Sequence, residues 1–130
     1  MEAGPEVCRS EDLTSGWSAL WLWRVPWALI IVGALWPRAR LWLWIPAFLV
    51  AGSGCVANAR RCGRLHCYVT GPLYLGAVAY LVLRLVLPSA VPFEAGVFLL
   101  VVVGASLSAQ MAEGRLGRYR RTARPPRGAM

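Results

Sequence analysis

Residues 54–72 read GCVANARRCGRLHCYVTGP, and this stretch decides the fold because it separates two long apolar runs. It contains three of the four cysteines, the only histidine and three of the arginines. The apolar run before it covers residues 41–59, and the run after it covers residues 71–87. The stretch therefore predicts the end of one helix, a basic turn and the start of the next helix.

Two further apolar runs extend this pattern over most of the chain, at residues 17–36 and 91–112. Each of the four runs has roughly the length that a helix needs to cross about 30 Å of hydrocarbon. Backbone polar groups cannot stay unpaired in lipid, which makes helices the expected structure for such runs. The sequence thus predicts an all-α fold, an integral membrane four-helix bundle of transmembrane hairpins, with the lipid bilayer as its surroundings.

The charged residues divide the chain into three regions. Residues 1–16 form an acidic tail, residues 17–112 hold the four spans, and residues 113–130 form a basic tail that we expect to be disordered. The net charge of +8 comes from fourteen arginines and no lysine. Because these arginines lie between and after apolar spans, they indicate membrane topology, and we expect no nucleic-acid partner.

The arginines also predict an orientation. The C-terminal tail holds six of them, and the loop between the second and third spans holds Arg60, Arg61 and Arg64. With four spans, these nine fall on one side, against Arg38 and Arg40 on the other. Basic residues stay in the cytoplasm. We therefore expect a multi-pass protein of the inner cell membrane with both termini cytoplasmic.

Smaller features predict how the spans begin and end. A tight hairpin at residues 37–40 would join the first two spans. Tryptophans would mark two membrane interfaces; they are Trp17, Trp21 and Trp23 at one, and Trp36, Trp42 and Trp44 at the other. Thr70 is a candidate cap of the third helix, with Pro72 in its first turn. Glu94 suits the start of the fourth helix, and a pairing of Glu94 with Arg84 is an alternative.

Two geometries are open for the cysteines and the histidine. If the second helix continues to about His66, then Cys55, Cys62 and His66 share one face. If it stops near Arg61, residues 62–67 form a short loop in which Gly63 allows the turn. In both cases two thiols and an imidazole lie near the cytoplasmic membrane face, and Cys55 lies about two turns deeper.

Several chemistries compete for this cluster. A structural disulfide does not suit a reducing cytoplasmic face. A zinc site lacks a C-x-x-C pair, and a catalytic Cys–His pair lacks a nearby acidic residue, so we expect no enzyme. Buried cysteines can be plain packing residues, yet positive neighbours promote thiolate. A soft metal ion remains, bound by Cys55, Cys62 and Cys67, with His66 as an auxiliary ligand or proton acceptor. No cofactor is expected.

Two thiolates suffice for a soft ion such as Hg²⁺, so the ion could pass from Cys55 to Cys62 and Cys67. The next carrier would be a cytosolic thiol, with Cys8 of the N-terminal tail as a candidate. Asn58 would be a polar group that faces a neighbouring helix. Four short helices could need a second copy of the chain to enclose a path, which makes a homo-oligomer an option.

The size, the span number and the thiol placement resemble those of the mercuric ion transport proteins of mercury-resistance operons. Residues 55–72, which are 18 of the 130, also look like a segment of small membrane proteins associated with such operons. The resemblance implies uptake of mercuric ion and its delivery to a cytosolic mercuric reductase. Those transporters carry a closely spaced cysteine pair in the first span. The first span here has no cysteine, so residue roles do not transfer directly.

The sequence therefore predicts a transport protein that binds a soft metal ion, mercuric ion or an organomercurial, and passes it to the cytoplasm. The alternative is a membrane scaffold or accessory subunit that transports nothing and has incidental cysteines.

Overall fold

A computed structural model describes residues 16–117 of the chain. This part is helical and contains no strand, which confirms the predicted all-α class. Its elements in chain order are α2 (Gly16–Ala19), the π-helical turn η1 (Leu20–Arg24), α3 (Val25–Leu35), α4 (Arg40–Cys62), α5 (Leu65–Val86) and α6 (Ala95–Leu116). The predicted tails, Cys8 included, lie mostly outside the described residues.

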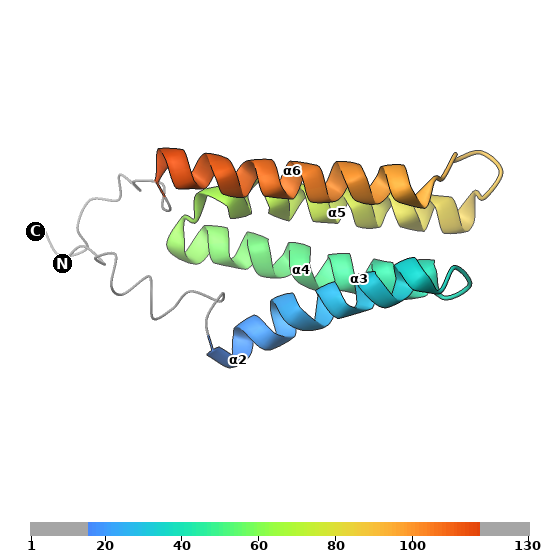
Figure 1. The fold of residues 1–130 in the computed structure, drawn as a ribbon, viewed down its shortest axis with the longest axis horizontal. Helices are drawn as coiled ribbons and strands as arrows, with labels where there is room; N and C mark the ends of the chain where they lie inside the picture. Colours follow the sequence, from blue (N-terminus) through green and yellow to red (C-terminus); the bar gives the residue numbers. More distant parts are fainter. Residues whose placement is uncertain (1–15, 118–130) are drawn as a thin grey trace, which may run out of the picture.

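The helices run up and down in sequence order (Figure 1). The first three elements follow one another as one rod, α4 packs against both α3 and α5, and α5 packs against α6. We call one end of the bundle the Gly63 end, where α2 begins, α4 turns into α5 and α6 finishes. The other, with the α3–α4 and α5–α6 connections, is the Pro88 end. The predicted hairpins and their alternating directions are thus present.

Within residues 16–117, four helices are long and apolar enough to cross a membrane: Gly16–Leu35, Arg40–Arg61, Leu65–Val86 and Ala95–Leu116. Many of their large apolar side chains point away from the protein; Leu35 is 81% exposed and Leu100 is 74% exposed. Exposed apolar surface on this scale is unusual for a soluble monomer. These features are typical of a multi-pass membrane protein.

The start of the third span was predicted wrongly. α5 begins at Leu65, not near residue 71, so Thr70 and Pro72 lie inside the helix and neither forms its start. The hydroxyl of Thr70 donates to the carbonyl of His66 at 3.0 Å instead of capping. The turn is short because Gly63 adopts a left-handed conformation, with φ of 64° and ψ of 31°.

The fourth span also differs from its predicted limits. α6 begins at Ala95 and continues to Leu116, so residues 113–116 belong to the helix and not to the tail. Glu94 is its N-cap and accepts a hydrogen bond from the amide of Val97 at 2.7 Å. The alternative pairing of Glu94 with Arg84 is not found, because Arg84 donates to the carbonyl of Val91 at 2.8 Å.

The α3–α4 hairpin shows why one interfacial tryptophan was assigned wrongly. Trp44 is fully buried, and its indole donates to the carbonyl of Ile30 at 2.9 Å. Gly33 makes room for this ring, since a Cβ there would lie 2.5 Å from Nε1 of Trp44. Arg40 closes the predicted turn by donating to the carbonyl of Gly33 at 3.1 Å. Trp42, which also lies on α4 and was predicted at the same interface, is 69% exposed.

Gly33→Ala should lower the free energy of unfolding by about 1–3 kcal/mol, because the new methyl group overlaps a buried and hydrogen-bonded ring. Thermal unfolding in one detergent, followed by circular dichroism, measures the change. Gly104→Ala is the matched control in α6, where an added Cβ meets nothing within 4 Å. It should be neutral or stabilising by up to about 1 kcal/mol. Equal midpoints for the two variants would contradict the packing of Trp44 on Gly33.

Candidate functional site: a buried thiol cluster

The predicted site residues come from two facing helices. Cys55 lies on α4, whereas His66 and Cys67 lie in the first turn of α5. Cys62 is the last residue of α4, and its side chain is outside the described part. Neither predicted geometry is right in full, because α4 ends at Cys62 and the next helix begins after only two residues. Cys55 and His66 therefore do not share a face of one helix.

The two described thiols lie next to each other. Cys55 and Cys67 are both fully buried and are not joined by a disulfide. They belong to one buried cluster where α4 packs against α5. The sulfur of Cys55 is also 3.2 Å from Oγ1 of Thr70, and Asn58 donates to the sulfur of Cys67 at 3.8 Å. We expected Cys55 about two turns deeper than Cys62 and Cys67, whereas its sulfur contacts Thr70, only three residues after Cys67 in α5.

His66 connects Cys67 to a carboxylate. Its Nε2 is 3.4 Å from the sulfur of Cys67, and its Nδ1 hydrogen-bonds Oε2 of Glu113. A carboxylate only accepts, so Nδ1 carries the proton in this pair. That leaves Nε2 of the neutral ring as an acceptor for the thiol proton of Cys67. Three side chains thus form a line in which a proton can move from sulfur to imidazole.

Glu113 holds this end of the bundle together. Its side chain is only 7% exposed, and Oε1 accepts a hydrogen bond from Nε of Arg64 at 3.1 Å. The interpretation that no acidic residue lies near the cysteines is therefore wrong, because Glu113 reaches His66 from α6. A signal was present in the sequence: within residues 16–117 the acidic residues are Glu94 and Glu113 alone. An acidic residue at the end of an apolar span, on the same side of the membrane as a basic loop, can be expected to pair with a basic side chain of that loop.

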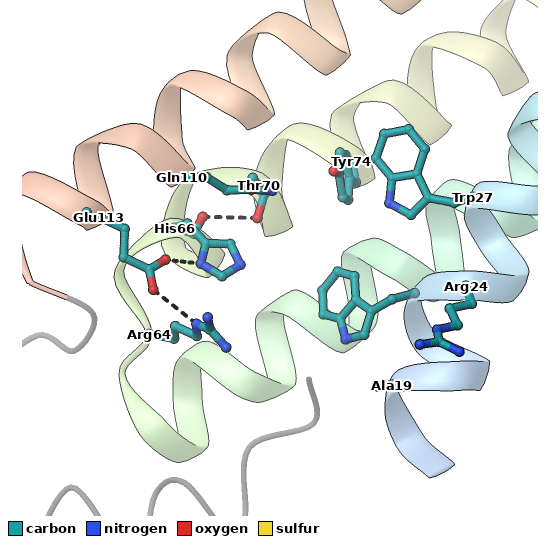
Figure 2. Close-up of a pocket in the computed structure, with 11 residues that line it drawn as sticks. Ala19, Arg24, Trp27, Arg64, His66, Thr70, Tyr74, Gln110 and Glu113 are labelled. Carbon is teal, nitrogen blue, oxygen red and sulfur yellow. Dashed lines mark hydrogen bonds and ion pairs between the residues drawn. The ribbon is translucent and has the colours of Figure 1, made fainter. Parts of the chain in front are cut away.

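A cavity of about 580 Å³ lies beside Cys67, His66 and Glu113, between α5–α6 and the first helix, by which we mean α2, η1 and α3 together (Figure 2). At the Gly63 end this first helix diverges from the other three, as Figure 1 shows. The polar side chains that line the cavity are Arg24, Arg64, His66, Thr70, Tyr74, Gln110 and Glu113. Trp23 and Trp27 contribute aromatic surface on the side of the first helix. The two cysteines do not line it, but they lie directly behind His66 and Thr70.

The donor set suits a soft cation bound by two sulfurs. Among the described residues no group of three or more His, Cys, Asp and Glu side chains is arranged to hold a metal ion. The described members of the predicted four-ligand site, Cys55, His66 and Cys67, thus do not form such a group, and the side chain of Cys62 lies outside the described part. Cys55 and Cys67 are two free thiols of the type that soft cations prefer as ligands. His66 is placed to accept a proton from Cys67.

Comparisons with protein-family models, with curated proteins and with solved structures found no match. The resemblance to mercuric ion transport proteins therefore stays a prediction from the sequence. The side chains with reactive chemistry in the described part gather at the Gly63 end, where two thiols, an imidazole and a carboxylate lie close together.

Proposed function

We propose that this protein is a membrane transport protein that binds a soft metal ion, mercuric ion or an organomercurial, and passes it to the cytoplasm. The observation that carries the proposal is the placement of two buried free thiols, Cys55 and Cys67, in one cluster on facing helices. Soft thiolates select soft cations over hard ones. Two sulfurs in contact can exchange one ion without releasing it, which is the elementary step of transfer between thiolates.

The surroundings of the pair support a metal ion as cargo. Both thiols are fully buried, which argues against a bulky substrate. Each S–H has an acceptor, which is Thr70 for Cys55 and His66 for Cys67. Metal binding displaces both protons. His66 takes the proton of Cys67 while Glu113 balances the imidazolium charge, and the proton of Cys55 leaves to solvent by way of the Thr70 hydroxyl, which lines the cavity. The thiols can thus become thiolates in an apolar setting that otherwise disfavours charge.

The route in our proposal uses the orientation expected from the arginines. The Gly63 end faces the cytoplasm, and the pair of Cys55 and Cys67 lies between the aromatic core and the cavity. That core includes Trp44, Phe48 and Phe98, which contact one another at ring-centroid distances of 5.7 to 6.5 Å. An ion would leave the pair through the cavity side, where polar groups lie, toward Cys62 or a cytosolic thiol.

A direct test is metal stoichiometry in the purified protein. With Cys8→Ser and Cys62→Ser both in place, the chain keeps only the buried pair and should bind one Hg²⁺ per chain in detergent. Absorption from the sulfur–mercury bonds in the near ultraviolet reports binding. Adding Cys55→Ser should remove tight binding. If the two-cysteine protein binds no more mercury than a protein without cysteines, the pair is not a metal site and the proposal fails.

A second candidate is a membrane enzyme with a thiol nucleophile, because Cys67, His66 and Glu113 form the nucleophile, base and orienting acid of such sites. The two candidates differ in their use of Cys55. Metal binding needs both sulfurs, whereas a nucleophile needs Cys67 alone. Cys55→Ser should therefore abolish mercury binding but leave reaction of Cys67 with a thiol-directed acylating probe. A scaffold would depend on neither thiol.

A further inference from the structure

The cavity at the Gly63 end is lined by side chains other than the two thiols, Cys55 and Cys67. Its volume of about 580 Å³ falls in the range of small-molecule sites, about 300–1,000 Å³. Metal ions need far less space. Figure 2 shows the cavity bordered by Arg24 and Trp27 from the first helix and by His66, Thr70 and Glu113 from α5 and α6. A cavity of this size with mixed charged and aromatic walls is suited to a small organic molecule.

The charges of the lining favour an anion. Its charged side chains are Arg24, Arg64 and Glu113, so with neutral His66 the formal balance is +1. Glu113 is engaged by both His66 and Arg64. Arg24 is exposed, on the opposite wall. A guanidinium binds carboxylates with two parallel hydrogen bonds, a geometry that favours a carboxylate over a simple ion. Gln110 adds an amide that can both donate and accept.

The position of the cavity links such an anion to the thiols. His66 and Thr70 line the cavity, and each also contacts one sulfur, at 3.4 Å for Cys67 and at 3.2 Å for Cys55. One layer of side chains therefore separates an occupant of the cavity from both sulfurs. A rotation of either side chain would bring the occupant into contact with an ion held by the pair.

We propose that the cavity binds a small carboxylate-bearing thiol that removes the metal ion from Cys55 and Cys67. The inference rests on the proposed function, and it identifies the molecule that accepts the metal ion from the protein. The incoming thiol loses its proton to solvent in the cavity, its sulfur bonds to the metal, and the bond from the metal to Cys67 breaks. His66, which took the proton of Cys67 when the metal was loaded, returns that proton to the Cys67 thiolate. A second thiol, also deprotonated to solvent, displaces Cys55, whose thiolate regains a proton from solvent by way of the Thr70 hydroxyl. Two thiols thus yield one bis-thiolate complex and two cysteine thiols, with no change of oxidation state.

The first arm of the test measures binding without metal. S-methylglutathione keeps the carboxylates but cannot exchange metal, and Trp23 and Trp27 should report its binding through a change in fluorescence. Arg24→Gln should weaken binding about tenfold to a hundredfold, the range for a lost hydrogen bond to a charged group. Arg38→Gln, at the Pro88 end, should leave it unchanged. Absence of saturable binding, or equal binding by the two variants, would overturn the inference. So would inorganic phosphate that competes equally well.

The second arm measures release from the protein loaded with Hg²⁺. Glutathione should release the ion faster than cysteamine, which is a thiol without a carboxylate, and Arg24→Gln should remove that difference. Equal release rates for the two thiols on the parent protein would reject a carboxylate-bearing thiol as the acceptor, even if Cys55 and Cys67 bind the metal ion. If no ion can be loaded on Cys55 and Cys67, the proposed transport function itself fails, whatever the first arm shows for S-methylglutathione.

Discussion

Cys67→Ser should remove mercury hypersensitivity from cells that express this protein without a mercuric reductase. Cells with the parent protein should accumulate radioactive Hg²⁺ and die at lower doses than cells without it. Serine has the same connectivity in a slightly smaller side chain and can still hydrogen-bond His66, but it provides a hard oxygen, which soft cations disfavour. Changes around a metal ligand weaken binding by about 10–100-fold, and here the ligand itself is lost, so uptake should fall to background.

The cysteine variants give this experiment its controls. Cys55→Ser should act as strongly as Cys67→Ser, because either change leaves a single sulfur in the pair. Cys8→Ser tests the N-terminal thiol as a later carrier and should slow delivery without removing binding. Immunoblots of membrane fractions must show equal amounts of each variant. Uptake that persists in both Cys55→Ser and Cys67→Ser would reject the thiol pair as the path and favour the scaffold alternative.

The sequence predicted the helices well because length and hydrophobicity determine them locally. It failed at the start of α5, where the chain turns polar at His66 and Cys67 although both are buried. Pro72 was read as a first-turn proline, yet it is the eighth residue of the helix. What extends this helix is packing against α4 and the bond from His66 to α6, and no local pattern contains those contacts.

The site was predicted in part for a similar reason. Cys55, His66 and Cys67 stand out by residue type, so chemistry alone selected them. Their partners do not: Thr70 was taken for a cap, and Glu113 lies 47 residues from His66. Such pairs form only when antiparallel spans bring the start of α5 beside the end of α6. Consecutive spans run in opposite directions, which predicts that the start of α5 and the end of α6 lie on the same side of the membrane. This rule does not predict which side chains meet there.

Glu113→Ala should lower the free energy of unfolding by about 2–4 kcal/mol in detergent. Removing one member of a buried ion pair costs about 3–5 kcal/mol, because the remaining charge is left without compensation. The effect should be smaller here, since the side chain of Arg64 keeps 18% exposure and can reach water. Glu113→Gln should lose less, because its amide oxygen can still accept from one of the two donors.

A second readout separates the link to the thiols from mere stability. Nitrogen NMR of His66 should show the proton on Nδ1 in the parent protein and a shift toward the other tautomer in Glu113→Ala. Because Nε2 then no longer accepts from Cys67, mercury retention should also fall, by about 10–100-fold, as when a carboxylate that orients a histidine at a metal site is removed. Glu94→Gln is the matched control: it changes an exposed acid at the α6 N-cap and should cost no more than about 1 kcal/mol. If both variants retained mercury equally, Glu113 would be a structural anchor only, and the proton path from Cys67 would end at His66.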